Sequence, residues 1–257
     1  MRIDAHAHAF DASVVLAQDR RYQPDYEAPA EAWLAQLDAH GIHCGVLVQP
    51  SFLATDNSYL LGVLARYPER LRGVAVAELT ATAEELADLK ARGVRAMRLN
   101  LIGRSHRGLK DIGGRRFLSQ CMELGLAVEV QAEGDAWLEI LPSLLVSGAP
   151  IVIDHLGRPT SPRCPGFGAI LDAAALPRVW VKVSAPYRSP PTVAGACLAL
   201  LAKRAGTERL IWGSDWPWTQ HEAGRSMSEA MRWITPHLPA SALPSVTGGN
   251  AARLFGF

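Results

Sequence analysis

The sequence predicts an α/β fold, and more specifically a single-domain (β/α)8 barrel (a TIM barrel) spanning residues 1–257. Eight short apolar segments recur along the chain, and a helix-like pattern follows each one. Near-continuous apolar strands are typical of parallel strands buried on both faces. One such barrel usually takes about 250 residues. A doubly wound open sheet is the alternative, but it usually carries a glycine-rich phosphate loop after its first strand, and residues 4–10 contain no glycine.

The predicted elements alternate in chain order. The strands are expected at residues 3–8, 43–49, 72–77, 94–100, 126–131, 150–154, 179–184 and 210–214. The helices are expected at about residues 29–40, 57–67, 82–93, 114–124, 167–176, 192–205, 227–237 and 243–254, and a further helix after the fifth strand is expected to end at about residue 146. Local signals mark some of their ends. Pro29 suits the first turn of its helix, Gly41 and Gly93 follow helix ends, and Thr82 with Glu85 forms a capping box.

Composition excludes several classes of function. The formal net charge is +1, which does not favour a general nucleic-acid or membrane-surface partner. The four cysteines are scattered and none forms a C-x-x-C pair, so we expect them to be reduced, as in a cytoplasmic protein. No apolar run is long and charge-free enough to span a bilayer.

Histidines and an aspartate follow three of the predicted strands. His6 and His8 are spaced i, i+2, which places both imidazoles on one face of the first strand. His155 follows the sixth strand and Asp215 the eighth. Active sites of barrels are built at the carboxyl ends of the strands, so we expect these four side chains to converge. Such a cluster can hold a metal, polarise a carbonyl or orient a water.

Arginines follow several strands as well. Arg98, Arg104, Arg158 and Arg188 are all expected around the same mouth of the barrel. Like charges repel, so this grouping favours an anionic substrate that balances them. Guanidinium groups match carboxylates with paired hydrogen bonds.

Short motifs along the whole chain resemble the amidohydrolase superfamily. They lie at residues 4–8, 45–50, 94–100, 154–159, 181–184, 212–217 and 249–255. The resemblance is to the amidohydrolase 2 type. Within that type it is to the lactone hydrolases, and among these to the pyrone-dicarboxylate branch. It implies a hydrolase that opens a small anionic, carboxylated lactone by water attack on the ester carbonyl.

The resemblance also implies roles for individual residues. Asp215 would be the general base that takes a proton from water, and His6, His8 and His155 would surround the water and the carbonyl. The implied substrate contacts are Ser51, Tyr22, Arg98, Arg104, Arg158 and Arg188.

The resemblance gives a mixed indication about metal. Members commonly bind one or two metals through His-x-His, later histidines and the aspartate after strand eight. Gln131 or Glu129 stands where a strand-five histidine is expected, and Arg98 and Asn100 stand where a carboxylated lysine would be. A site for two metals is therefore not expected. The resemblance to the pyrone-dicarboxylate branch implies no required cofactor, with protonated histidine or arginine supplying the electrophile. The alternative is one zinc ion on the four predicted catalytic residues, His6, His8, His155 and Asp215.

Other functions on the same barrel stay open. The first is a different enzyme on this scaffold, either a zinc-dependent sugar lactonase or amidohydrolase, or a decarboxylase. The other is a non-catalytic barrel that binds an anionic metabolite. The oligomeric state is not predicted.

Overall fold

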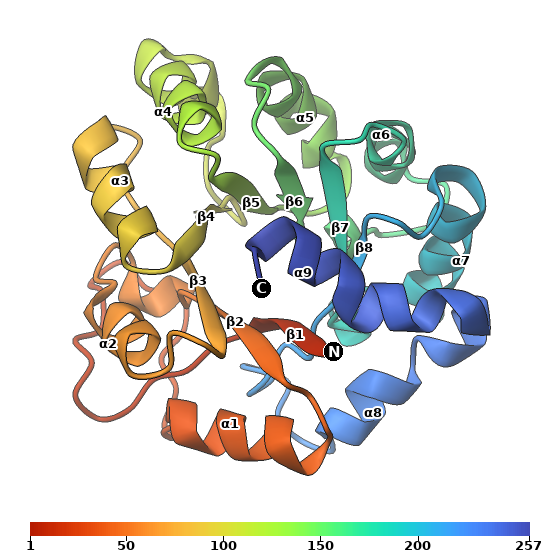
Figure 1. Ribbon diagram of the computed structural model, residues 1–257. Coiled ribbons are helices and arrows are strands. Elements are labelled where there is room, and N and C mark those ends of the chain that lie inside the picture. The colour runs from red at the N-terminus through yellow and green to blue at the C-terminus, as the bar shows by residue number, and fades with distance from the viewer.

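The computed structural model describes residues 1–257, and its centre is a ring of eight parallel strands in the order β1 to β8. Each strand pairs in parallel with the next one along the chain, as Figure 1 shows. The predicted (β/α)8 barrel is therefore confirmed. The strands are β1 Ile3–Ala7, β2 Cys44–Val48, β3 Leu71–Ala75, β4 Val94–Asn100, β5 Ala127–Gln131, β6 Ile151–Ile153, β7 Val179–Val183 and β8 Leu210–Trp212.

The ring closes between β1 and the segment just after β8. Ala7 pairs in parallel with Trp216, and the backbone N–H of His8 donates to the carbonyl of Trp216 at 2.7 Å. The N–H of Asp215 donates to the carbonyl of His6 at 2.8 Å. This seam therefore sets Asp215 beside the two histidines of the first strand.

Helices surround the ring on its outer side, except α9, which crosses one end of the barrel (Figure 1). They are α1 Ala30–Ala39, α2 Ser58–Arg66, α3 Ala83–Ala91, α4 Ile112–Glu123, α5 Trp137–Val146, α6 Pro165–Ala174, α7 Val193–Ala205, α8 Met227–Arg232 and α9 Asn250–Phe255. The predicted capping box is present in α3, where Thr82 and Glu85 bond to each other's backbone N–H at 3.2 and 2.8 Å. None of these helices combines the length and apolar character needed to cross a membrane.

The two last predicted helices are shorter than expected. The helix predicted over residues 227–237 ends at Arg232, and a separate 3-10 turn holds Pro236, which cannot donate a backbone hydrogen bond. The helix predicted over residues 243–254 begins with a wider π turn, Ser245–Gly249, before α9. The glycine pair at residues 248–249 lies in this turn.

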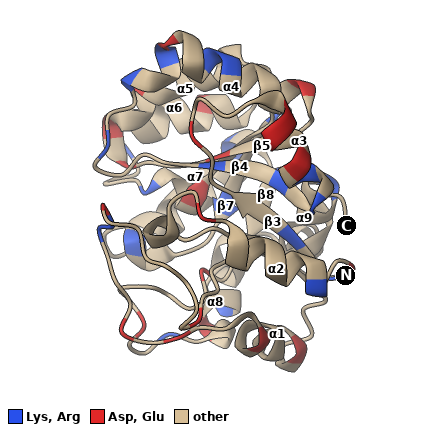
Figure 2. Ribbon diagram, turned by 90° about the vertical axis from the view of Figure 1, so that its left-hand side faces the viewer, with Lys and Arg blue, Asp and Glu red and all other residues tan.

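Two apolar cores fill the molecule. The larger one lies between the sheet and the outer helices, and the smaller one lies inside the ring. The inner core includes Ala251 and Phe255 of α9 together with strand residues such as Ile3 and Val46. Helix α9 thus closes the amino-terminal end of the barrel, and Figure 2 shows it near both termini, away from the long loops. The polar side chains inside the barrel therefore lie toward its carboxyl end.

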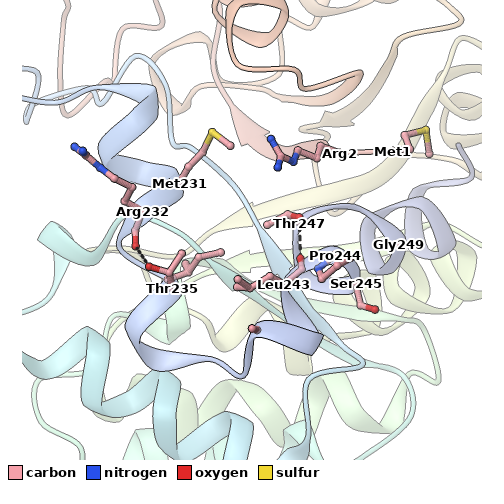
Figure 3. A pocket seen from close by; sticks show the side chains of 12 residues that line it. Met1, Arg2, Met231, Arg232, Thr235, Leu243, Pro244, Ser245, Thr247 and Gly249 are labelled. Atoms are coloured by element: carbon pink, nitrogen blue, oxygen red, sulfur yellow. Dashed lines mark hydrogen bonds between the residues drawn. The ribbon is translucent and has the colours of Figure 1, made fainter.

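A large hollow lies at this amino-terminal end, between the first residues and segments near α8 and α9 (Figure 3). Its volume is about 870 Å³, and no aspartate, glutamate or histidine lines it. The hydroxyl groups of Thr235 and Thr247 donate to backbone carbonyls within it, both at 2.8 Å. This hollow therefore offers none of the predicted chemistry.

Candidate active site

The four predicted catalytic residues meet at the carboxyl end of the barrel. One carboxylate oxygen, Oδ1 of Asp215, lies 3.5 Å from Nε2 of His6 and 3.8 Å from Nε2 of both His8 and His155. All four residues are buried. The structure thus assembles the group that the sequence predicted, while their catalytic roles stay predictions.

An unusual turn after β6 positions His155. Four successive residues, His155 to Arg158, have positive φ angles of 52°, 57°, 78° and 48°. Residues other than glycine rarely adopt this conformation, and such strain collects at functional sites. The turn is fixed from outside, because Nε1 of Trp137 donates to the carbonyl of Gly157 at 2.8 Å. The result points His155 inward, where its Nδ1 lies 2.8 Å from Oγ of Ser184.

The two oxygens of Asp215 have different surroundings. Oδ2 accepts hydrogen bonds from the hydroxyl of Tyr187 at 2.6 Å and from Nε of Arg188 at 2.9 Å. Oδ1 is buried and has no hydrogen-bond partner within the protein. Burial alone would raise the pKa of Asp215, but Arg188 and the imidazoles outweigh it and hold the pKa well below its usual range. Asp215 is therefore ionised, with one oxygen free to receive a proton.

The imidazoles are neutral. Burial lowers the pKa of His8 to about 3, with Arg98 adding to the effect, and burial lowers the pKa of His155 to about 4. Burial and the nearby Lys182 also lower the pKa of His6. A neutral imidazole has one N–H donor and one nitrogen lone pair, so each ring can donate on one side and accept on the other.

A layer of charged side chains lies directly under the histidines. Nζ of Lys182 is 2.5 Å from Oε2 of Glu129, 2.9 Å from Nδ1 of His6 and 3.6 Å from Oδ1 of Asp154. Arg98 belongs to the same layer, since its Nη2 lies 3.7 Å from Oδ2 of Asp154. Burial and the adjacent Asp154 raise the pKa of Glu129 above its ordinary value. This layer holds the strands β1, β4, β5, β6 and β7 together beneath the site.

A cavity of about 210 Å³ opens above the histidines. His8 and His155 line it, whereas His6 and Asp215 are fully buried beneath them. No aspartate or glutamate lines the cavity. Its arginines are Arg21, Arg98, Arg158 and Arg188. Small anions are what such a lining attracts.

Most of the predicted substrate contacts line this cavity. Ser51 and Tyr22 do so, together with Arg98, Arg158 and Arg188. Arg104 does not line the cavity, and its side chain is exposed on the loop after β4.

All three of these arginines already have partners within the protein. Arg158 pairs with Glu133 at 3.2 Å, and Arg188 bonds Asp215 as described above. Arg98 donates to Gln131 at 2.8 Å.

Arg21 takes part in the cavity, although sequence reasoning gave it no role. It lies on the long loop after β1, and its guanidinium donates to the carbonyl of Ile102 and to Oδ1 of Asn100, both at 3.0 Å. An irregular loop has no periodicity from which its reach can be inferred, and the only signal was the pair Arg20-Arg21. Lys182 also received no role, although a charge inside an apolar strand is a signal of a buried network.

The cluster can hold a metal ion. His6, His8 and Asp215 form one group of ligand atoms within 4.8 Å of one another, and His6, Asp154 and His155 form another. Neutral imidazoles with a carboxylate suit zinc, and the unpartnered Oδ1 of Asp215 marks a point where a cation or water would bind. His6, His8 and Asp215 therefore fit a metal, and the expectation that none is required gains no support from this geometry.

A buried carboxylate among imidazoles, at the carboxyl end of a (β/α)8 barrel and below a cationic cavity, is an arrangement whose chemistry suits a hydrolase. The family comparison agrees with that class. The Amidohydrolase family model matches residues 3–257, so this chain belongs to the Amidohydrolase family.

Similar proteins come from several bacteria. A 4-sulfomuconolactone hydrolase of Rhizobium radiobacter is 32% identical, over 98% of this chain and 89% of its own. A solved 2-pyrone-4,6-dicarboxylic acid hydrolase of Pseudomonas putida is 41% identical with a TM-score of 0.91, covering 99% of this chain and 97% of that one. A solved protein of the same description from Acinetobacter baumannii, with citric acid bound, is 35% identical with a TM-score of 0.94, covering 100% and 99%.

Proposed function

We propose that this protein is a hydrolase that opens a small lactone carrying negatively charged groups, with Asp215 as the general base. The observation that carries the proposal is the free Oδ1 of Asp215, which faces three imidazoles beneath an arginine-lined cavity. The names of the similar proteins support lactones as the substrate class. The remaining question is which groups the lactone carries.

The cavity supports a substrate with two anionic groups. Arg21 finds only neutral acceptors within hydrogen-bond distance, so its charge is not balanced there. Arg98 lines the same cavity, and its one carboxylate neighbour, Asp154, lies 3.7 Å away beneath the site. Guanidinium groups bind carboxylates and other oxyanions with paired, charge-assisted hydrogen bonds. The similar proteins are named for a sulfonated muconolactone and a pyrone dicarboxylate, and one of them was solved with citric acid, a polycarboxylate.

The reaction follows from the two sides of Asp215. A water molecule held by Oδ1 and a neutral imidazole attacks the lactone carbonyl, and Oδ1 takes its proton. The ring C–O bond then breaks, and the leaving ring oxygen takes the proton from Asp215, which returns the carboxylate to its ionised form. Imidazole N–H groups and Arg98 stabilise the negative charge that develops on the carbonyl oxygen.

Substrate binding strengthens the base. A carboxylate with a strongly lowered pKa is a weak base, and Arg188 is the largest of the causes that lower the pKa of Asp215. An anionic group of the substrate near Arg188 offsets that charge, which raises the pKa of Asp215. The same anions that give specificity therefore also activate the water.

We propose that a metal is not required for this reaction. If one binds, His6, His8 and Asp215 would hold it, and it would polarise the carbonyl or lower the pKa of a bound water. The second candidate function, a zinc-dependent hydrolase on the same barrel, is favoured by the same ligand group.

A lactone panel tests the proposal. The panel contains 2-pyrone-4,6-dicarboxylate, a sulfonated muconolactone and a neutral sugar lactone, each assayed after chelation and with added zinc. We expect kcat/KM for the best dianionic lactone to exceed that for the neutral one at least a hundredfold, and chelation to leave it largely intact. Preference for the neutral lactone would contradict the substrate class. Activity that disappears on chelation and returns with zinc would favour the zinc-dependent alternative.

A further inference from the structure

A buried lysine lies directly below the histidine cluster and has no part in the reaction as described so far. Lys182 is fully buried and does not line the cavity. Lysine is almost never fully buried unless it is paired, and Lys182 is held between Glu129 and Asp154. Its third neighbour is His6, at 2.9 Å.

The contact with His6 can run in only one direction. An ammonium group has three donors and no acceptor, and Nζ of Lys182 lies against side-chain oxygens of both Glu129 and Asp154. Lys182 therefore donates to Nδ1 of His6, so that Nδ1 carries no proton. A neutral His6 must then carry its proton on Nε2.

A second set of contacts requires the same arrangement. Nδ1 of His8 lies 2.7 Å from the carbonyl oxygen of Val48, which can only accept. The proton of His8 is therefore on Nδ1, and its Nε2 has a free lone pair. Since Nε2 of His6 lies 3.3 Å from Nε2 of His8, one of the two must donate, and only His6 can. The chain of hydrogen bonds runs from Lys182 through His6 and His8 to Val48.

We propose that Lys182 is a positioning residue that holds His6 in the tautomer with its proton on Nε2, which makes His6 a donor to the substrate carbonyl and opposes metal binding through that nitrogen. A preorganised N–H stabilises the oxyanion at no cost of rearrangement during the reaction. A metal on His6 needs the Nε2 lone pair, so the proton would have to move to Nδ1 and face the ammonium of Lys182. The role toward the carbonyl rests on the proposed lactone hydrolysis, whereas the tautomer does not.

Two variants isolate the effect of Lys182. Lys182→Met alone leaves Glu129 buried without its cation, which threatens folding. We therefore compare the double variant Lys182→Met/Glu129→Gln with Glu129→Gln. Both lack the Glu129 charge, and only the second retains the donor to His6. The readouts are the ¹⁵N chemical shifts of the histidine rings and the affinity for zinc alone, measured by competition with a chelator.

The expected results differ between the two variants. Wild type and Glu129→Gln should show His6 protonated on Nε2, whereas the double variant should gain the Nδ1–H form, with Asp154 at 3.3 Å as its acceptor. Zinc should bind the double variant at least tenfold more tightly than Glu129→Gln.

A wild-type spectrum with His6 protonated on Nδ1 would overturn the proposal, and that spectrum requires no variant to fold. Equal tautomers and equal zinc affinity in the two variants would overturn it as well. Neither readout uses a substrate, so a failure of the lactone assignment leaves both results unchanged and is detected separately in the lactone panel.

Discussion

At the scale of single residues, the environment of each arginine decides its role. The sequence predicted four arginines around the mouth, and three of them line the cavity. Arg188 donates a hydrogen bond to Asp215 and lowers the pKa of that carboxyl group, and Arg158 is paired with Glu133. Arg21 extends into the cavity from a loop far away in sequence, whereas Arg104 lies outside it. Spacing along a strand predicts where a side chain starts but not which partner it finds.

Arg21 and Arg104 form a matched pair of variants. Arg21→Met should raise KM for a dianionic lactone by about ten- to a hundredfold, because a hydrogen bond to a charged group is worth roughly 1.5–3 kcal/mol. Arg104→Met should change KM by less than about threefold, since Arg104 does not line the cavity and an exposed charge that makes no contact with the substrate is largely screened. Steady-state kinetics at physiological ionic strength measures both. A large effect at Arg104 with none at Arg21 would reverse the assignment.

At the scale of elements, the strand ends place the site. The eight strands could be predicted because each is a short, mainly apolar segment followed by a helical pattern, and the capping box of α3 because its two residues are local. The turn after β6 could not be predicted, since packing against Trp137 holds three residues other than glycine in the left-handed region. The π turn before α9 was also missed, because its width is set by tertiary contacts.

The β6 turn predicts a large effect of a single methyl group. Gly157 has a φ of 78°, and a Cβ there would collide with Cδ1 of Ile170 and lie 3.0 Å from Nε1 of Trp137. Gly157→Ala should lower the free energy of unfolding by about 1–3 kcal/mol and reduce kcat, because His155 and Arg158 share the turn.

The control lies in α6. Gly168 has no atom within 4 Å of a Cβ position and an ordinary φ. Gly168→Ala should be neutral or stabilising by up to about 1 kcal/mol, since alanine is the better helix former. Urea unfolding and kcat measured on both variants decide the matter. Equal stability of the two variants would show that the turn is not strained as described.

At the scale of the whole molecule, barrel closure builds the site. The chain meets itself where β1 pairs with residues after β8, and this seam joins the first histidines to Asp215. Asp4 strengthens it by accepting from the backbone N–H and hydroxyl of Ser214 at 2.7 and 2.6 Å. Helix α9 closes the opposite end. The convergence of His6, His8, His155 and Asp215 was predictable from strand order, because all parallel strands end at one rim.

The most direct test of the account is kcat of Asp215→Asn with the best lactone of the panel. The substitution keeps the size of the side chain and removes the base, so we predict a loss of about 10²- to 10⁴-fold in kcat. A thermal melt confirms that the variant is folded, since Tyr187 and Arg188 lose a charged partner. A folded Asp215→Asn variant with kcat within about threefold of wild type would contradict the central claim that Asp215 activates the water.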